Sequence, residues 1–155
     1  MSRFRIANLG LGSITQLDVA MNRLQAIRYA EVVLRKGHFV AIYPRWWPRI
    51  ASHWDAWKDS YLRPLNREEC RVYYSFPMGS PDYMAINYVV AGPSTSYSTL
   101  MRAMMTINTI ATSRNASGIV CQATNSRLTE RLMSRWGFEK HALSLGDDHY
   151  IKRLK

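Results

Sequence analysis

The first long hydrophobic pattern in the chain has apolar residues at spacings of three and four, which is the period of an amphipathic helix. It predicts a helix from Ser13 to Lys36, which ends at Gly37. A short strand is expected before this helix, and a second strand over Phe39 to Tyr43 is expected after it. The apolar positions of the helical face are Ile14, Leu17, Met21, Leu24, Ile27, Val33 and Leu34.

Aromatic side chains recur at helical spacing after Pro48, and such a stripe lines a core or a groove more often than it stacks on bases. Trp46 and Trp47 are adjacent in the chain, so they cannot share one helix face. One of these two tryptophans is therefore the candidate for an accessible ring. The residues of the stripe are Ile50, Trp54, Trp57 and Tyr61.

The least charged part of the chain runs from Tyr83 to Ile110, where Arg102 is the only charged residue. Such a run is typical of a buried strand and of the helix that covers it. A proline- and glycine-containing loop precedes it and separates two strand patterns. The predicted elements are strands over Val72–Phe76 and Tyr83–Ala91 and a helix that Ser96 or Ser98 caps.

The last third of the chain predicts the order strand, helix, strand and strand. Ile119 to Cys121 form a short apolar strand, and Asn125 is expected to cap the helix that follows. Gly137 lies where a helix often needs a left-handed residue to end. The apolar face of the helix consists of Leu128, Leu132, Met133 and Trp136, and the last two strands flank the turn Gly146-Asp147-Asp148.

This order of elements, with the ending Arg135-Trp136-Gly137-Phe138-Glu139, resembles the GNAT superfamily of acyl-CoA-dependent N-acyltransferases. The resemblance is strongest over residues 117–155. It implies one α/β domain over residues 1–155, with a mixed, mostly antiparallel sheet flanked by helices. It also implies acetyl-CoA or another acyl-CoA as the cofactor and an amine as the acyl acceptor.

In that family the fourth strand diverges from the fifth, and its exposed backbone holds the pantetheine arm of coenzyme A. The loop and helix start that follow give N–H groups to the pyrophosphate, because unpaired N–H groups and the helix dipole both favour anions. The residues to which the resemblance assigns cofactor binding are Val89, Val90, Ala91, Ser94, Thr95, Ser96, Tyr97, Ser98 and Asn125.

Two features depart from the family's pattern. Gly92 is the only glycine where the family carries a double-glycine signature, and Pro93 removes one N–H donor. Met133 stands where many members carry a tyrosine that protonates the leaving thiolate, and a thioether cannot donate a proton. A second function therefore stays open, in which a non-catalytic GNAT-like scaffold binds nucleic acid or a protein partner.

Two residues are candidates for the proton transfer of an acyl transfer reaction. Tyr88 lies on the expected fourth strand, near the point where the acyl group would move. His53 lies on an expected helix and is a candidate base if that helix borders the cleft. A residue at either position is more often structural than catalytic. No histidines have the spacing of zinc ligands, so no metal site is expected.

The net charge of +10, from 21 basic and 11 acidic residues, favours anionic partners. Coenzyme A and nucleic acid are both polyanions, but the arginines are scattered along the chain, which does not favour nucleic acid. Cys70 and Cys121 are too few to indicate a disulfide framework, so a reducing, cytoplasmic location is expected. No stretch reaches about 18 consecutive apolar residues, and no membrane partner is expected.

Overall fold

The computed structural model describes residues 27–45, 67–122, 129–140 and 149–155. Several predictions fall outside these residues and concern the first strand, the helix over residues 13–26, the accessible tryptophan at 46 or 47, the aromatic stripe after Pro48, the turn at 146–148 and the candidate site residues His53 and Asn125. In the described part of the chain, seven strands form one sheet in the order β2-β1-β3-β4-β5-β7-β6. The strands are β1 (Tyr29–Arg35), β2 (His38–Arg45), β3 (Glu69–Ser75), β4 (Tyr83–Ala91), β5 (Gly118–Gln122), β6 (Glu139–Lys140) and β7 (His149–Arg153).

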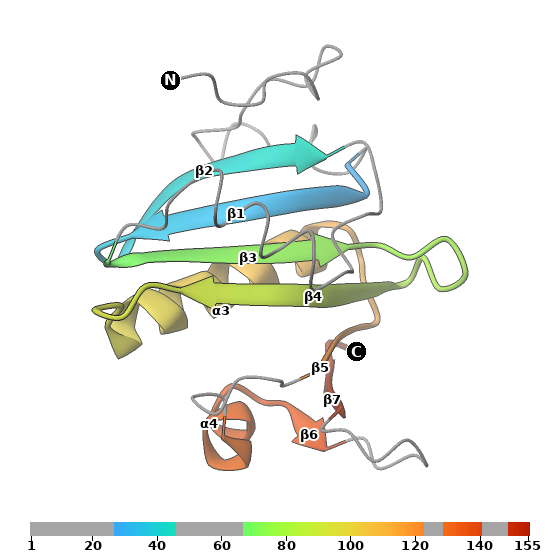
Figure 1. The fold of residues 1–155 in the computed structure, drawn as a ribbon. Coiled ribbons are helices and arrows are strands. Elements are labelled where there is room, and N and C mark those ends of the chain that lie inside the picture. Colours follow the sequence, from blue (N-terminus) through green and yellow to red (C-terminus); the bar gives the residue numbers. More distant parts are fainter. Residues whose placement is uncertain (1–26, 46–66, 123–128, 141–148) are drawn as a thin grey trace.

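The sheet is mixed and mostly antiparallel, as the sequence predicts for an α/β chain (Figure 1). Strands β4 and β5 pair in parallel, and every other described pair is antiparallel. A parallel pair needs a crossover connection, which the helix α3 (Tyr97–Ser113) supplies. The two halves of the sheet therefore meet along the β4–β5 pair.

The predicted helix to Lys36 is wrong over its last part, because Tyr29–Arg35 forms strand β1. Lys36 and Gly37 make the turn of a hairpin to β2, with φ angles of 52° and 77°. Two central residues with positive φ match the right-handed twist of paired strands. The glycine that reads as a helix end is thus a hairpin residue, and the β-branched pair Val32 and Val33 favours the strand.

Helix α3 covers one face of the sheet (Figure 1). Ser96 caps it as predicted, and its hydroxyl accepts a hydrogen bond from the Thr99 backbone N–H at 3.3 Å. Ile107 and Ile110 of α3 are fully buried. Alternate residues of the strands meet them, because successive side chains point to opposite faces of a sheet. These strand residues include Ala30, Val32, Leu34, Cys70, Val72, Tyr74, Met84 and Ile119.

The second described helix, α4 (Glu130–Arg135), is shorter than predicted. Thr129 caps it, with its hydroxyl accepting from the Leu132 backbone N–H at 3.2 Å. Asn125, the predicted cap, lies outside the described residues. Gly137 has a φ of 85° and ends the helix as predicted.

Gly118 begins β5 at the junction of three strands. It pairs with Tyr83 of β4 on one side and with Arg153 of β7 on the other. A Cβ atom at this position would lie 2.9 Å from the backbone oxygen of Lys152 and 3.0 Å from the ring of Tyr83. Only glycine fits here, so this residue permits the close approach of β4, β5 and β7.

Candidate functional site

The central feature of the site is the point where the described pairing of β4 with β5 ends. The parallel pairing runs from Tyr83 opposite Gly118 to Ile86 opposite Cys121. Beyond Ile86, β4 has no β5 partner among the described residues, although its pairing with β3 continues to Ala91. The outer half of β4 therefore has one edge paired with β3 and one edge that no described strand occupies.

A β-bulge marks the same point. Tyr73 of β3 is in register with Tyr88 and Tyr74 with Ile86, so Asn87 is an extra residue in β4. The side-chain amide of Asn87 donates to the hydroxyl of Ser75 at 3.0 Å. A bulge bends its strand and increases the local twist, which turns the outer half of β4 away from its earlier course.

The predicted site residues of β4 lie in this outer half. Val89, Val90 and Ala91 are half-buried and follow the bulge directly. Tyr88 occupies the register position beside Tyr73. His53, the other candidate for proton transfer, lies outside the described residues, as does Asn125. The four predicted residues of β4 are consecutive in the strand and lie beyond its last described pair with β5.

The loop from β4 to α3 uses most of its own backbone donors. The N–H of Gly92 donates to the Glu69 carbonyl at 2.9 Å, and that of Ser94 donates to the Arg67 carbonyl at 2.8 Å. The N–H of Thr95 donates back to the Gly92 carbonyl at 3.1 Å. Ser94 and Thr95 are thus placed beside the site, but their backbone N–H groups are already bonded within the protein.

The start of α3 differs from the loop before it. The N–H groups of Ser96, Tyr97 and Ser98 have no partner in the part of the chain that the structure describes. The exposed hydroxyls of Ser96 and Ser98 lie 2.9 Å apart. Unpaired N–H groups at a helix start, with the positive end of the helix dipole, form an environment that favours an anion.

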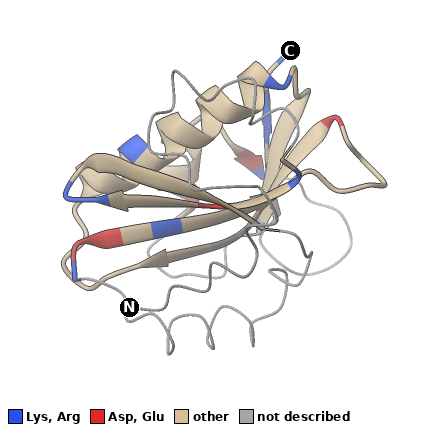
Figure 2. Ribbon diagram, turned by 90° about the horizontal axis from the view of Figure 1, so that it is seen from above, with Lys and Arg blue, Asp and Glu red and all other residues tan. Residues whose placement is uncertain are grey.

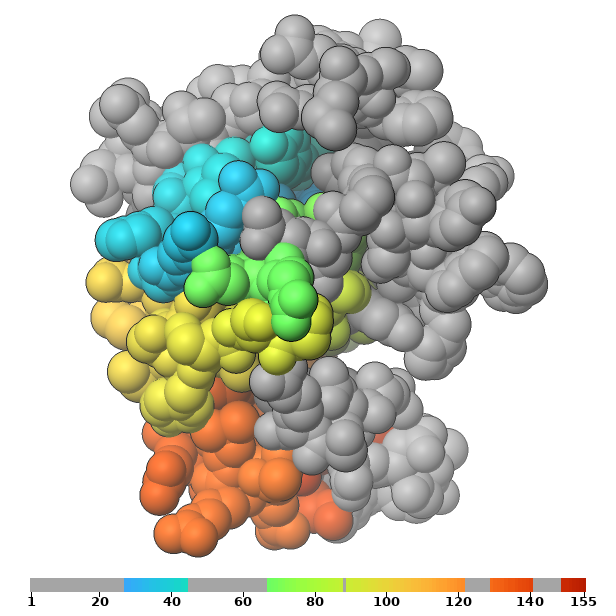
Figure 3. Space-filling model, turned by 60° about the vertical axis from the view of Figure 1, so that its left-hand side comes forward, coloured from blue at the N-terminus to red at the C-terminus, as the bar shows by residue number. Residues whose placement is uncertain are grey.

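An aromatic contact joins α3 to α4. The ring of Tyr97, the first residue of α3, stacks on the ring of Trp136 at the end of α4, with 6.4 Å between centroids and 18° between planes. Figure 3 shows the yellow start of α3 directly above the orange surface of α4. The contact links the helix after β4 to the helix after β5. Sequence reasoning missed it, because Trp136 reads only as part of an apolar helix face.

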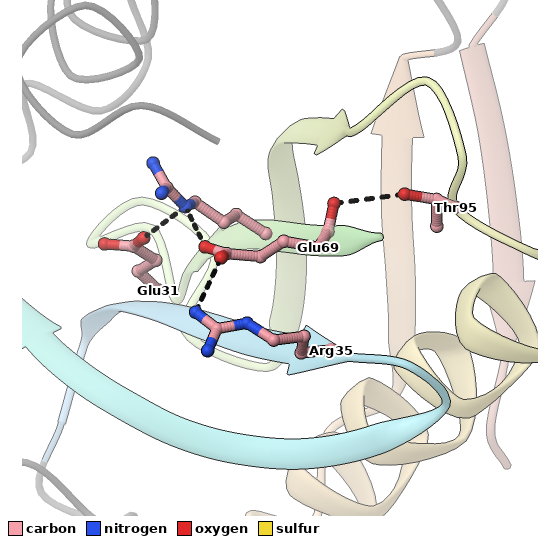
Figure 4. A network of polar contacts seen from close by, with 5 residues as sticks. Glu31, Arg35, Glu69 and Thr95 are labelled. Atoms are coloured by element: carbon pink, nitrogen blue, oxygen red, sulfur yellow. Dashed lines mark hydrogen bonds and ion pairs between the residues drawn. The ribbon is translucent and has the colours of Figure 1, made fainter. Parts of the chain in front are cut away.

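A buried charged network lies on the sheet face opposite α3 (Figure 4). The Glu69 carboxylate accepts from Arg71 Nε at 2.7 Å and from Arg35 Nη2 at 2.9 Å. Arg71 Nε also lies 3.8 Å from a carboxylate oxygen of Glu31, which is fully buried. Burial raises the pKa of Glu69, but the hydrogen bonds from Arg71 and Arg35 outweigh it and hold that pKa below its ordinary value.

The register places Glu31 within a row of tyrosines that crosses four strands. Tyr43 of β2, Glu31 of β1, Tyr73 of β3 and Tyr88 of β4 occupy successive partner positions. The sequence gives one signal for this row, a lone glutamate in the otherwise apolar run Ala30-Glu31-Val32-Val33. Because the sequence pattern of that run predicts a helix, it gives no indication of the position of Glu31 beside the tyrosines.

Neither cysteine is suited to nucleophilic chemistry. Both are free thiols, and burial raises the pKa of Cys70 and of Cys121 to about 12. The nearby Glu69 carboxylate contributes to the rise for Cys70. Since the thiolate is the nucleophile, each thiol is almost entirely protonated at neutral pH. Among the described residues, no group of three or more histidine, cysteine, aspartate or glutamate side chains is arranged to hold a metal ion.

Charged residues are spread over the ribbon, and α3 carries a single one, Arg102 (Figure 2). Exposed arginines come from separate elements, including Arg35 of β1, Arg131 of α4 and Arg153 of β7.

No helix in the described residues is long and apolar enough to cross a membrane. Comparison of the chain with protein-family models, with curated proteins and with solved structures finds no match.

Proposed function

We propose that the protein is an acyl-CoA-dependent N-acyltransferase with a GNAT-like fold. The observation that carries the proposal is the end of the described β4–β5 pairing after Ile86, at the bulge of Asn87. A strand edge that no described strand occupies offers backbone N–H and C=O groups to an extended ligand that carries amides of its own. The pantetheine arm of coenzyme A is such a ligand, and it would lie along Tyr88 to Ala91.

The start of α3 supports the same assignment. It follows β4 after a five-residue connection, at 92–96, and presents the N–H groups of Ser96, Tyr97 and Ser98. A ligand extended along β4 would bring its phosphates toward these groups. The Ser94 and Thr95 N–H groups are already bonded within the protein. The proposed phosphate contacts are therefore limited to the N–H groups at the start of α3.

The proposed reaction is direct attack of an amine nitrogen on the thioester carbonyl. A C–N bond forms, the C–S bond breaks, coenzyme A leaves as the thiolate, and the amine gives up a proton. Backbone N–H groups at the bulge would polarise the carbonyl, and binding would hold the two reactants in line. Tyr88 and His53 are the proposed proton acceptors. Met133 is buried and carries no exchangeable proton, so the thiolate leaves without help from that position.

Release of coenzyme A from acetyl-CoA in the presence of a panel of amines tests this function. A thiol-specific dye reports the released thiol, and the raised pKa of both cysteine thiols keeps the background of the protein low. The proposal expects amine-dependent release that saturates with acetyl-CoA. Failure of acetyl-CoA to bind at millimolar concentration would contradict the function, whichever amine is supplied.

A further inference from the structure

Glu69 connects the charged network of the sheet to the loop that leads into α3 (Figure 4). Its carboxylate is held by Arg71 and Arg35, as described above. Its backbone carbonyl accepts two further bonds, from the Gly92 N–H at 2.9 Å and from the Thr95 hydroxyl at 3.1 Å. Glu69 is therefore held at its side chain by two arginines and at its main chain by the loop that leads into α3.

These bonds lie in the interior of the protein. Glu69 and Thr95 are 4% and 5% exposed, and Gly92 is buried. Buried hydrogen bonds are costly to lose, because a donor or acceptor left unsatisfied does not regain its bond to water. The loop is thus held to the start of β3 at a defined distance, and Thr95 is the last such contact before the helix.

The far side of the helix start is fixed as well. Tyr97 stacks on Trp136, so the first turn of α3 lies between the Thr95 contact on β3 and the aromatic contact on α4. A loop rich in glycine would have to be ordered when a ligand binds. This loop is ordered by contacts already present, which lowers the entropic cost of binding.

We propose that Glu69 and Thr95 are positioning residues for the phosphate end of the acyl-CoA substrate, an inference that rests on the proposed acyltransferase function. They touch no substrate themselves. They hold the Ser96, Tyr97 and Ser98 N–H groups at the place where the phosphates arrive, and they have no role toward the pantetheine arm on β4.

The test compares two ligands in three variants. Acetyl-CoA carries the phosphates, and acetyl-pantetheine carries the same thioester arm without them. Thr95→Val keeps the side-chain shape but removes the hydroxyl, Thr95→Ser restores the hydroxyl, and Thr109→Val is the matched control. Thr109 is an exposed residue of α3 whose hydroxyl donates to the Met105 carbonyl at 2.9 Å, within the same helix.

Loss of one hydrogen bond predicts that Thr95→Val weakens acetyl-CoA binding about tenfold. Acetyl-pantetheine binding is expected to stay unchanged, and Thr95→Ser and Thr109→Val are expected to bind both ligands as the wild type does. If Thr95→Val fails to fold, Arg35→Met replaces it, because Arg35 is half exposed at its side chain and acts on the same carboxylate. The same selective loss of acetyl-CoA binding, about threefold, is expected there.

The outcomes separate the two proposals. A wild type that binds neither ligand contradicts the acyltransferase function and, with it, the positioning role. If the wild type binds both ligands, and Thr95→Val or Arg35→Met loses affinity for both ligands equally or for neither, the positioning role is overturned. The proposed acyltransferase function then stands.

Discussion

The side-chain amide of Asn87 donates to the hydroxyl of Ser75 at 3.0 Å, across the bulge at which β4 loses its β5 partner. Ser75 is buried in the neighbouring strand, so the bond ties the extra residue of β4 to a fixed position. The bulged conformation of β4 is therefore stabilised from β3, independently of any ligand.

Replacement of Asn87 by alanine is expected to lower the turnover of acetyl-CoA about tenfold, because the bulge loses the bond that fixes it. Ser75→Ala removes the same bond from the other strand and should have a similar effect. Steady-state kinetics measures both, with thermal denaturation to confirm folding. Two folded variants with wild-type turnover would show that this bond has no part in the reaction.

Gly118→Ala is expected to destabilise the protein by roughly 1–3 kcal/mol, the usual cost of overpacking. The new Cβ would lie 2.9 Å from the Lys152 carbonyl oxygen, which is backbone and cannot move aside cheaply. Urea denaturation gives the free energy of unfolding. Gly79→Ala is the matched control, since a Cβ there meets no atom within 4 Å and should change stability little.

The Glu69 carboxyl makes a prediction about acid stability. Its pKa lies below the ordinary 4.5 in the folded protein, because the bonds from Arg71 and Arg35 outweigh burial. The unfolded chain then takes up this proton at a higher pH than the folded chain does, so the stability from Glu69 is complete above pH 4.5. It is lost as the pH falls through the folded pKa.

Denaturation from pH 7 down to pH 3 should therefore show a smaller decline for Glu69→Gln than for the wild type. Glu139→Gln, at an exposed position of β6, is the control and is expected to follow the wild-type curve. A Glu69→Gln profile with the wild-type slope below pH 4.5 would contradict the assignment of this ion pair.

The two cysteines are expected to resist modification in the folded state. A pKa raised from 9.0 to about 12 leaves roughly a thousandfold less thiolate at a given pH, and burial also limits access. Iodoacetamide at neutral pH should label two thiols rapidly in urea and almost none without it. Rapid labelling of Cys70 in the native protein would show that the start of β3 opens far more readily than its burial implies.

Local patterns predicted the elements whose signals are local. The bounds of β4, the Ser96 cap of α3 and the positive φ of Gly137 each follow from a short stretch of sequence and agree with the structure. The sequence pattern predicts a helix where strand β1 lies, because a glycine such as Gly37 can end a helix or turn a hairpin with the same left-handed geometry. The difference between a helix end and a hairpin turn here is that β1 pairs with β2 and β3, and this pairing is a property of the whole fold.

The contacts around the candidate site depend on residues that are distant in the chain. The Thr95–Glu69 bond joins positions 26 residues apart, and the Tyr97–Trp136 stack joins two helices from different halves of the sheet. The bulge at Asn87 is visible only against the register of β3. None of these has a sequence signal of its own, so the geometry of the candidate site could not be predicted from the sequence.

Hydrogen exchange of individual backbone amides, with and without acetyl-CoA, tests the central claim most directly. Ligand bound along the separated strand should slow exchange at β4 residues 88–91 and at Ser96, Tyr97 and Ser98, while the β4–β5 pairs from Tyr83 to Ile86 remain as they are. Acetyl-CoA that binds without protecting either segment, or that protects a different surface, would contradict the account.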